Sequence, residues 1–256
     1  MYKYLLLIIG LLALHTIDAQ SVTLYPGLNG KDLAAQLRKD YYPQQVLSYS
    51  QARDTLYSLI DLSTNDSLYC IYSAYAHHVD VSQDPSQYIY DNGKSTGMNC
   101  EHSWPQSKGT KEGQARSDMH HLFPSKIDVN QARGNLPFGE VYDPAATHWY
   151  FREDNLEWMP PPSIIDNYSE LGQGYFEPRE AKKGDVARAL FYVYVMYYDQ
   201  VDHGFFEEQA QTLLRWHQLD EVDAQERQRS YLISIYQDGK ENPFVLDHTL
   251  APRLLK

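Results

Sequence analysis

Residues 185–198 most strongly constrain the fold, because other parts of the chain must cover them. Apolar residues recur there at spacings of three and four and form one broad face: Val186, Ala189, Leu190, Val193, Met196 and Tyr197. This period is typical of an α-helix whose apolar side faces a core. The tyrosines of the segment resemble a base-stacking platform, but aromatic residues at helical spacing are far more often core. We expect a core helix over Asp185–Tyr198.

Weaker patterns predict both helices and strands elsewhere. Helical spacing covers Lys31–Arg38 and Ser50–Ile60, whereas Val79–Gly97 has the polar, Gly- and Asp-containing composition of a loop. Five segments are expected to be extended: Leu68–Tyr72, Asn99–Pro105, Met119–Pro124, Trp149–Phe151 and Leu156–Met159. The mixture predicts an α+β fold.

Two further helices carry end signals. Ile127–Ala132 reads as a short helix before Gly134, which gives residues 99–135 the order strand, loop, strand, helix. Asp223 and Glu226 have the spacing of a capping box, and Gly239 is expected to stop the helix that follows.

Residues 1–19 have the features of a secretory signal peptide. Lys3 precedes an apolar run from Leu5 to Leu14 that is too short to span a bilayer, and Ala19 is a small residue at the expected cleavage site. A buried N-terminal helix is the alternative, but nothing polar interrupts the run. We expect an exported protein, periplasmic, cell-surface or extracellular, with no membrane span in the mature chain.

The formal charge of −12 argues mildly against a nucleic-acid partner, because phosphate contacts by Lys and Arg supply much of the affinity of such proteins. Residues 108–133 have the opposite balance, since their basic residues outnumber Glu112, Asp118 and Asp128. The basic residues are Lys108, Lys111, Arg116, Lys126 and Arg133. A local basic face or a bound cation would have to attract a nucleic acid.

The chain contains 2 cysteines, Cys70 and Cys100. They either pair or remain as two buried thiols. Neither lies in a CxxC spacing, so zinc–thiolate chemistry has no support.

The densest group of polar residues lies between Asn99 and Asn135. Glu101 and Asn130 offer oxygen ligands that suit a hard cation such as Mg²⁺ or Ca²⁺. His102 could activate water while the cation stabilises the departing oxygen of a phosphodiester. Because neighbours on a strand point to opposite faces, Glu101 and His102 can serve one site only if the strand bends or ends there. Pro105 favours an early end.

Each of these features also has an ordinary explanation. A Glu-His pair is usually a solvated strand edge, and a single histidine more often forms hydrogen bonds in a core than acts in catalysis. His120 and His121 could hold zinc, but adjacent histidines on a strand diverge and no third ligand has a suitable spacing.

Three longer motifs decide between these alternatives. Residues 99–107 (NCEHSWPQS), 118–124 (DMHHLFP) and 129–139 (VNQARGNLPFG) together resemble the core of the bacterial endonuclease I family. Further matches are residues 183–189 (KGDVARA), Trp216-His217 before Val222-Asp223, and residues 242–245 (NPFV). The resemblance therefore covers the chain from about Ser50 to Val245.

The resemblance implies a ββα-metal nuclease core embedded in a mostly helical single domain. In that core a bent hairpin carries the base and packs on a helix that carries a metal ligand. The implied organisation is a signal peptide over 1–19, an N-terminal extension over 20–48, an endonuclease I-like domain over 49–248 and a C-terminal tail over 249–256. We expect a monomer.

The resemblance also assigns roles by position. His102 is the general base, and Glu101 and Asn130 hold one Mg²⁺ ion, with Mn²⁺ or Ca²⁺ as alternatives. The ion contacts the scissile phosphate and stabilises the leaving 3′ oxygen, so that products carry a 5′ phosphate. Four further residues match: Asp118 and His120, which orient the base or the ligands, and Arg133 and Asn135, which either brace the helix and its turn or contact phosphate.

Some positions depart from the family pattern. His121 stands where many relatives have Asn, and the cysteines that stabilise some relatives are mostly missing. The arginine that stabilises the transition state in some relatives lies in a variable loop, which leaves Lys108, Lys111 and Arg116 as candidates. We favour Arg116, because it is close to the second motif and can bind phosphate through two hydrogen bonds.

The expected function is therefore endonucleolytic cleavage of DNA, with RNA as a further substrate and little sequence preference. A nuclease-fold module that only binds is the first alternative, but it would be favoured by loss of Glu101, His102 or Asn130, and all three are present. Another metal-dependent phosphoesterase is the second. His102 must be neutral to accept a proton, so activity should fall below its pKa, near 6.5 if unperturbed.

Overall fold

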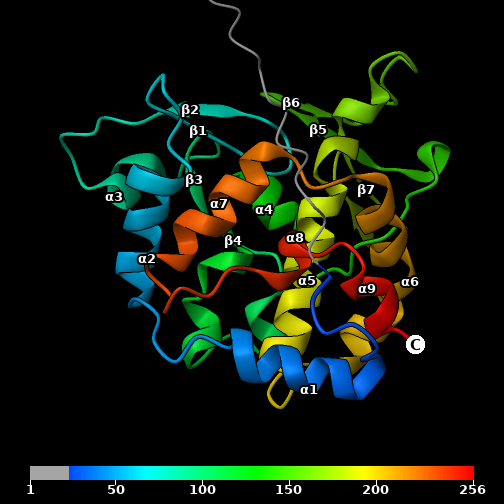
Figure 1. The fold of residues 1–256 in the computed structure, drawn as a ribbon. Helices are drawn as coiled ribbons and strands as arrows, with labels where there is room; N and C mark the ends of the chain where they lie inside the picture. The colour runs from blue at the N-terminus through cyan, green and yellow to red at the C-terminus, as the bar shows by residue number, and fades with distance from the viewer. Residues whose placement is uncertain (1–22) are drawn as a thin grey trace, which may run out of the picture.

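Helix α5 (Lys183–Met196) runs through the middle of the computed structural model, which describes residues 23–256 (Figure 1). The predicted signal peptide, residues 1–19, lies outside the described residues. The expectation of a core helix is confirmed. Buried residues occupy every side of α5, including Val186, Ala187, Leu190 and Val193, rather than the single predicted face. A helix buried all round must be covered by neighbours on all sides.

Other helices supply much of this cover. Helices α1 (Gly30–Tyr41), α6 (His203–Leu219) and α8 (Pro243–Leu246) pack against α5, and α9 (Leu250–Leu254) packs against α1 and α6. Helix α7 (Ala224–Ser234) contacts α8 and the turn Met119–His121.

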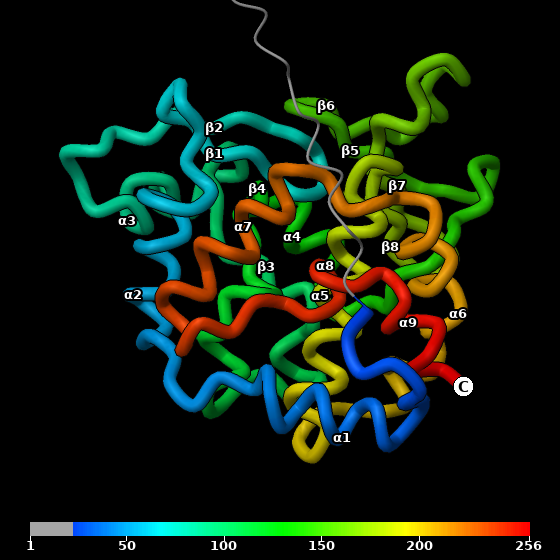
Figure 2. Tube along the Cα trace, in the orientation of Figure 1, coloured from blue at the N-terminus to red at the C-terminus, as the bar shows by residue number. Residues whose placement is uncertain are grey.

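The two ends of the described chain lie side by side (Figure 2). Arg253 of α9 donates hydrogen bonds to the backbone carbonyls of Leu24, Tyr25 and Leu28. The predicted extension and tail therefore contribute helices α1 and α9 to the packed structure, and Leu33, Leu37 and Leu250 are completely buried.

The described strands form three small antiparallel sheets, and the α+β class is confirmed. One pairs β1 (Ser67–Tyr69) with β2 (Ala76–His78), and one pairs β3 (Met98–His102) with β4 (Leu122–Lys126). The third has the order β6-β5-β7-β8, made of Asp154–Leu156, His148–Phe151, Ser169–Gly172 and Tyr175–Glu177.

Three helices flank the β3–β4 hairpin. Helix α4 (Ile127–Arg133) follows β4 directly, packs on both strands and ends at Gly134, as predicted. Helix α3 (Pro85–Tyr90) contacts β3, and α2 (Tyr49–Thr55) contacts α3. Helix α2 begins at Ser48 with a capping box shared with Gln51 and continues as a π-helical turn over Leu56–Ile60.

Several predicted boundaries were wrong. The strand predicted over Leu68–Tyr72 ends at Tyr69, because the chain turns back from Cys70, whose carbonyl accepts from Ala74 N. Strand β4 begins only at Leu122, because the Asp118 carboxylate caps a 3₁₀ turn over Met119–His121. The predicted loop Val79–Gly97 contains α3, which Asp84 caps with Pro85 in the first turn. The strand predicted over Leu156–Met159 coincides with β6 only at Leu156.

The capping signal of α7 is half confirmed. Asp223 accepts a hydrogen bond from Glu226 N at 2.7 Å. The Glu226 carboxylate does not return to Asp223 but takes two hydrogen bonds of 2.6 Å from the Arg188 guanidinium on α5. Both side chains are buried, so this ion pair ties α7 to the central helix.

The first residues of α5 are fixed by charge and by close packing. Glu170 and Glu177 lie opposite each other in the β7–β8 register, and Lys183 Nζ lies 2.7 Å from Glu177 Oε1. Burial raises the pKa of Glu177 to about 7, although the Lys183 ammonium opposes this shift. Gly184 leaves no room for a side chain, because a Cβ there would collide with the carbonyl oxygen of Asp220.

Among residues 23–256, no helix is long and apolar enough to cross a membrane. Cys70 and Cys100 are free thiols, of which Cys70 is buried and Cys100 partly buried.

Replacement of Arg188 by Met should destabilise the protein strongly. The change leaves the buried Glu226 carboxylate without its partner, which typically costs about 3–5 kcal/mol. Urea unfolding of Arg188→Met measures this loss. The matched control is Arg227→Met on exposed Arg227, which forms no ion pair within residues 23–256 and should change stability by less than about 0.5 kcal/mol. Equal free energies of unfolding for the two variants would contradict the claim that Arg188 compensates the buried Glu226 carboxylate.

Candidate functional site

The β3–β4 hairpin and α4 bring four of the polar motif residues together. Asn99 and Glu101 alternate along β3 and therefore share one face of the strand. Asn130 and Arg133 are one helical turn apart on α4. Asn130 Nδ2 lies 2.6 Å from Asn99 Oδ1, and Arg133 Nη1 lies 3.2 Å from Glu101 Oε1. These adjacent contacts put Asn130 and Glu101 on the same helix–strand interface.

The Glu101 carboxylate is almost completely enclosed, with 3% of the residue exposed. Its Oε1 accepts a hydrogen bond of 2.6 Å from the Tyr72 hydroxyl, in addition to the Arg133 contact. Burial raises the pKa of Glu101 even though the Arg133 guanidinium and the Tyr72 hydrogen bond both lower it. A carboxylate in this state would be further stabilised by a second cation.

Glu101 and Asn130 fit a hard divalent cation. Both offer oxygen donors, and because Asn130 uses its Nδ2 for Asn99, its Oδ1 is left for another partner. In the described part of the chain, no group of three or more His, Cys, Asp or Glu residues is placed to hold a metal. The donor set is therefore one carboxylate and one amide, which suits an ion that keeps several waters.

His102 lies at the end of β3 with both ring nitrogens in contact. Nε2 is 3.0 Å from the carbonyl oxygen of Arg116, and Nδ1 is 3.3 Å from Gln106 Nε2. A carbonyl can only accept, so Nε2 carries the hydrogen and Nδ1 keeps its lone pair, which accepts from Gln106. The rings of Tyr49 and His121 lie 5.4 Å from the imidazole.

Burial sets the protonation of His102. Only 5% of the residue is exposed, and burial together with the neighbouring His121 lowers its pKa to about 3. The ring is therefore neutral at neutral pH, as a base must be. The pKa near 6.5 considered in the sequence analysis holds only for an unperturbed histidine. The pKa of buried His102 is lower than that value.

Strand β3 ends at His102, which meets the condition set by the sequence for Glu101 and His102 to serve one site. Glu101 faces Tyr72 and Arg133, whereas His102 faces Tyr49, Gln106 and the Arg116 carbonyl. The two groups leave the strand on different sides. A reacting phosphate can reach both only across the end of the strand.

The three candidate basic residues differ in their surroundings. Lys108 Nζ is 3.1 Å from the Asp202 carboxylate, so its charge already has a partner. Lys111 is exposed. Arg116 is exposed beside His102, with its guanidinium carbon 4.9 Å from the centre of the Tyr49 ring.

The other matched residues occupy three kinds of environment. Asp118 is completely buried and accepts hydrogen bonds from the hydroxyls of Tyr192 and Tyr197 on and beside α5. His120 is buried with Nε2 2.8 Å from the carbonyl of Lys240. Arg133 is completely buried, and Asn135 is exposed.

His121, at the position that departs from the family pattern, is completely buried. Its Nε2 donates to the carbonyl of Ala115 at 2.6 Å, and its Nδ1 is buried without a hydrogen-bond partner in residues 23–256. The structure adds Tyr72, Gln106 and Tyr49 to the site. Gln106 stands in the first motif without an assigned role, and no pattern marked Tyr49 or Tyr72, because only the folded chain brings α2, residue 72 and the turn after β3 next to the hairpin.

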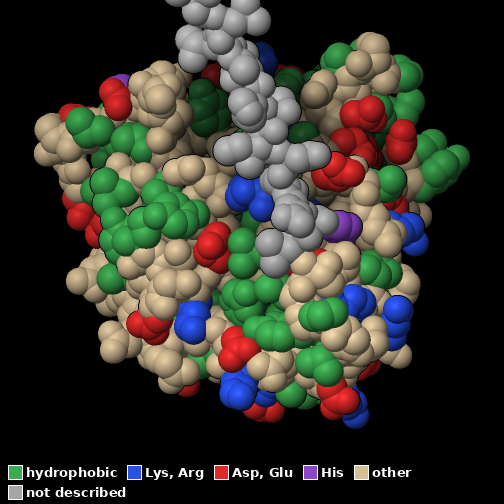
Figure 3. Space-filling model, viewed as in Figure 1, with side chains coloured by type: hydrophobic (Ala, Val, Ile, Leu, Met, Phe, Trp, Pro, Cys, Tyr) green, Lys and Arg blue, Asp and Glu red, His purple; other side chains and the backbone are tan. Residues whose placement is uncertain are grey.

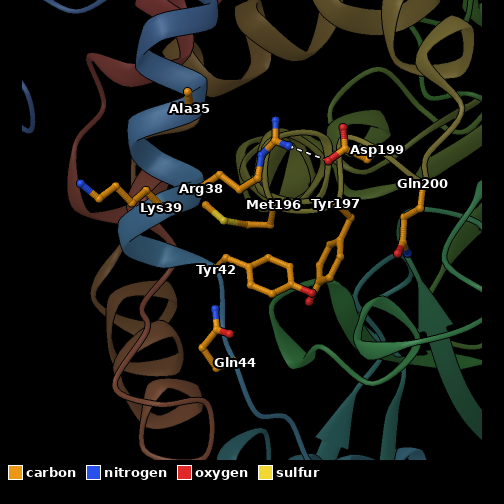
Figure 4. A pocket seen from close by; sticks show the side chains of 9 residues that line it. All are labelled: Ala35, Arg38, Lys39, Tyr42, Gln44, Met196, Tyr197, Asp199 and Gln200. Atoms are coloured by element: carbon orange, nitrogen blue, oxygen red, sulfur yellow. Dashed lines mark hydrogen bonds and ion pairs between the residues drawn. The ribbon is translucent and has the colours of Figure 1, made fainter.

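A surface pocket of about 640 Å³ lies between α1 and the end of α5 (Figure 4), and neither Glu101 nor His102 lines it. Arg38 in its wall pairs with Asp199 at 2.9 Å. Tyr197 in the same wall donates to Asp118, so the pocket borders the scaffold of the site rather than its reacting groups.

Known proteins similar to this chain are nucleases. The family model described as Endonuclease I matches residues 29–249. The chain is 30% identical to a protein named extracellular ribonuclease from Bacillus subtilis, over 90% of this chain and 77% of that protein. It is also 30% identical to an extracellular ribonuclease from Bacillus amyloliquefaciens, over 92% of this chain and 78% of that protein. The chain therefore belongs to the endonuclease I family of nucleic-acid-hydrolysing enzymes.

Proposed function

We propose that this protein is a secreted, metal-dependent endonuclease that hydrolyses phosphodiester bonds with water activated by His102. The observation that carries the proposal is the fixed orientation of the imidazole. The Arg116 carbonyl holds the Nε2 hydrogen and leaves Nδ1 as the proton acceptor, next to the interface that contains Glu101 and Asn130. Secretion is supported by residues 1–19 and by the relatives named extracellular.

Nδ1 is the atom that removes the proton from water. Gln106 donates to Nδ1 at 3.3 Å, so a water molecule has to take its place or approach beside it. The enclosed ring is a weak base in the free protein, but a phosphate anion beside it would favour the imidazolium. Proton transfer would therefore be easiest when substrate is bound.

Glu101 and Asn130 would hold the cation, Mg²⁺ or alternatively Mn²⁺ or Ca²⁺. When bound there, the ion supplies positive charge to the oxygen that leaves the phosphorus. Arg133 cannot reach substrate because it is fully buried, so we assign it a positioning role. It donates to the carbonyl oxygens of His102 at 3.2 Å and Ser103 at 2.5 Å and thereby fixes the end of β3.

We assign β3, β4 and α4 to the hairpin and helix of a ββα-metal core, because α4 follows β4 directly and packs on both strands. Arg116 is the residue we place at the scissile phosphate, because it is exposed beside His102 whereas Lys108 is paired. Asp118 and His120 act through the scaffold. Asn135 is exposed, and we assign it a contact to phosphate.

The substrate class follows from the nucleophile. Activation of water does not use the ribose 2′-hydroxyl, so both DNA and RNA fit this chemistry. The relatives bear the name ribonuclease, which favours RNA as one substrate. Backbone contacts carry little sequence information, and we expect low sequence preference.

Purified mature protein should nick supercoiled plasmid in Mg²⁺ and not in EDTA. The His102→Ala variant should be slower by at least about 10²-fold, because general-base catalysis contributes about that much or more. His78→Ala, a change of an exposed histidine on β2, is the matched control and should retain activity. No cleavage by the wild type in Mg²⁺, Mn²⁺ or Ca²⁺ would instead favour a module that only binds nucleic acid.

End-group analysis tests the nucleophile. Cleaved DNA and RNA oligonucleotides should both carry 5′ phosphates, and 2′-O-methyl RNA should still be cut. Mass spectrometry of the fragments measures both the end groups and the cleavage of 2′-O-methyl RNA. The appearance of 2′,3′-cyclic phosphates would show attack by the 2′-hydroxyl and would rule out water activated by His102.

NMR titration of the histidine rings tests the tautomer and the pKa. In metal-free protein the His102 ring should remain neutral, with hydrogen on Nε2, from about pH 8 down to about pH 5, because burial lowers its pKa to about 3. A His102→Gln spectrum assigns the signal. A protonation midpoint near 6.5, or hydrogen on Nδ1, would contradict the enclosed geometry.

A further inference from the structure

The ring of Tyr49 is in contact with two arginines and with the base. The guanidinium carbons of Arg53 and Arg116 lie 4.8 and 4.9 Å from its centre, and the His102 ring lies 5.4 Å away. The three partners come from α2, the turn Gln114–Arg116 and the end of β3. We call Tyr49, Arg53 and Arg116 the arginine pair site.

Neither arginine of this site has a carboxylate partner within residues 23–256. The ion pairs that the described chain forms use other cations, including Lys108 and Lys126 at 3.1 and 2.8 Å from their acids. Arg53 Nε is in addition buried without a hydrogen-bond partner. In a chain with a formal charge of −12, two uncompensated guanidinium groups on one ring mark a local anion site.

Helix α2 explains why the site is fixed. Tyr49 and Arg53 are four residues apart and lie on one face of the helix. The capping box of Ser48 and Gln51 holds the first turn, which carries Tyr49. A guanidinium stacked on an aromatic ring keeps its N–H donors at the edge, where they can bind the oxygens of a phosphate.

We propose that the arginine pair site binds the nucleic-acid backbone at two neighbouring phosphates, Arg116 at the scissile one and Arg53 at the next. This inference rests on the proposed function and adds Arg53 to the residues that bind the substrate and Tyr49 to those that position them. Tyr49 is a positioning residue, because its ring already contacts both arginines and His102. The Tyr49 ring is therefore not free to stack on a nucleobase. The site contacts the backbone of the nucleic acid and does not distinguish its sequence.

The test measures binding without cleavage. Fluorescence anisotropy of labelled DNA and RNA in EDTA gives Kd over a range of salt concentrations for the wild type and for Arg53→Met. The variant should bind about 5- to 10-fold more weakly at low salt, and the slope of log K against log salt should fall by about 0.7–0.9, the value for one phosphate contact. In Mg²⁺ the loss should appear in KM with kcat little changed, because Arg53 contacts a phosphate that does not react.

Matched variants separate binding from folding. Arg53→Lys should restore part of the affinity, and Arg227→Met, a change of an exposed arginine on α7, should match the wild type. Tyr49→Phe keeps the ring and should bind normally, whereas Tyr49→Leu should lose affinity. Arg53→Met with the Kd and salt slope of Arg227→Met would overturn the inference, as would weaker binding with an unchanged slope.

The outcomes also distinguish this inference from the proposed function. If the wild type nicks plasmid and Arg53→Met binds nucleic acid as the wild type does, only the arginine pair site is refuted. A wild type that never cleaves but binds through Arg53 refutes the nuclease activity and leaves the phosphate site standing.

Discussion

The site depends on how one buried charge is compensated. Arg133 is completely enclosed, and its guanidinium contacts the Glu101 carboxylate and the carbonyl oxygens of His102 and Ser103. Removing both charges of such a pair from water is costly, so the pair is weak evidence for stability. Its effect here is geometric. Arg133 of α4 binds the two carbonyl oxygens at the end of β3, which would otherwise need a longer strand pairing. One interaction thus ends the strand beside His102, places Glu101 next to Asn130 and partly offsets the burial that raises the pKa of Glu101.

The motifs that carry the family resemblance divide into those at the candidate site and those in the scaffold. Lys183, Gly184 and Arg188 of the motif at residues 183–189 serve the scaffold. Lys183 pairs with Glu177, Gly184 allows the backbone of Asp220 to approach, and Arg188 pairs with Glu226. Asn242 caps α8 and donates to the carbonyl of Arg188. Asp118 belongs to the same scaffold, since it ties the turn before β4 to α5 through two tyrosine hydroxyls. The central helix thereby sets where the second strand of the hairpin begins.

Local signals were sufficient for some elements and not for others. The order strand, loop, strand, helix over residues 99–135 and the end of α4 at Gly134 could be predicted, because periodicity and glycine act over a few residues. Helix α6 was missed although Phe205, Phe206, Gln209, Leu213 and Trp216 form its buried face, because polar Gln209 occupies a buried position in the apolar pattern. The environment of His102 could not be predicted either. Its lowered pKa comes from burial under Tyr49, Gln106 and the Arg116 carbonyl, which are brought together by long-range packing.

The net charge of −12 by itself would oppose a polyanionic substrate, but net charge is the wrong quantity to compare. At physiological ionic strength the Debye length is about 8 Å, so acidic side chains remote from the site are largely screened. On the face shown in Figure 3, acidic and basic side chains are interspersed, without an extended basic field. For the proposed substrate, the charges that matter are those around His102: two guanidinium groups without a carboxylate partner among residues 23–256, a neutral imidazole, and a carboxylate already offset by Arg133. A cation held by Glu101 and Asn130 would add to this positive balance. Attraction would therefore be confined to the end of β3, beside His102, where we propose that the phosphate reacts.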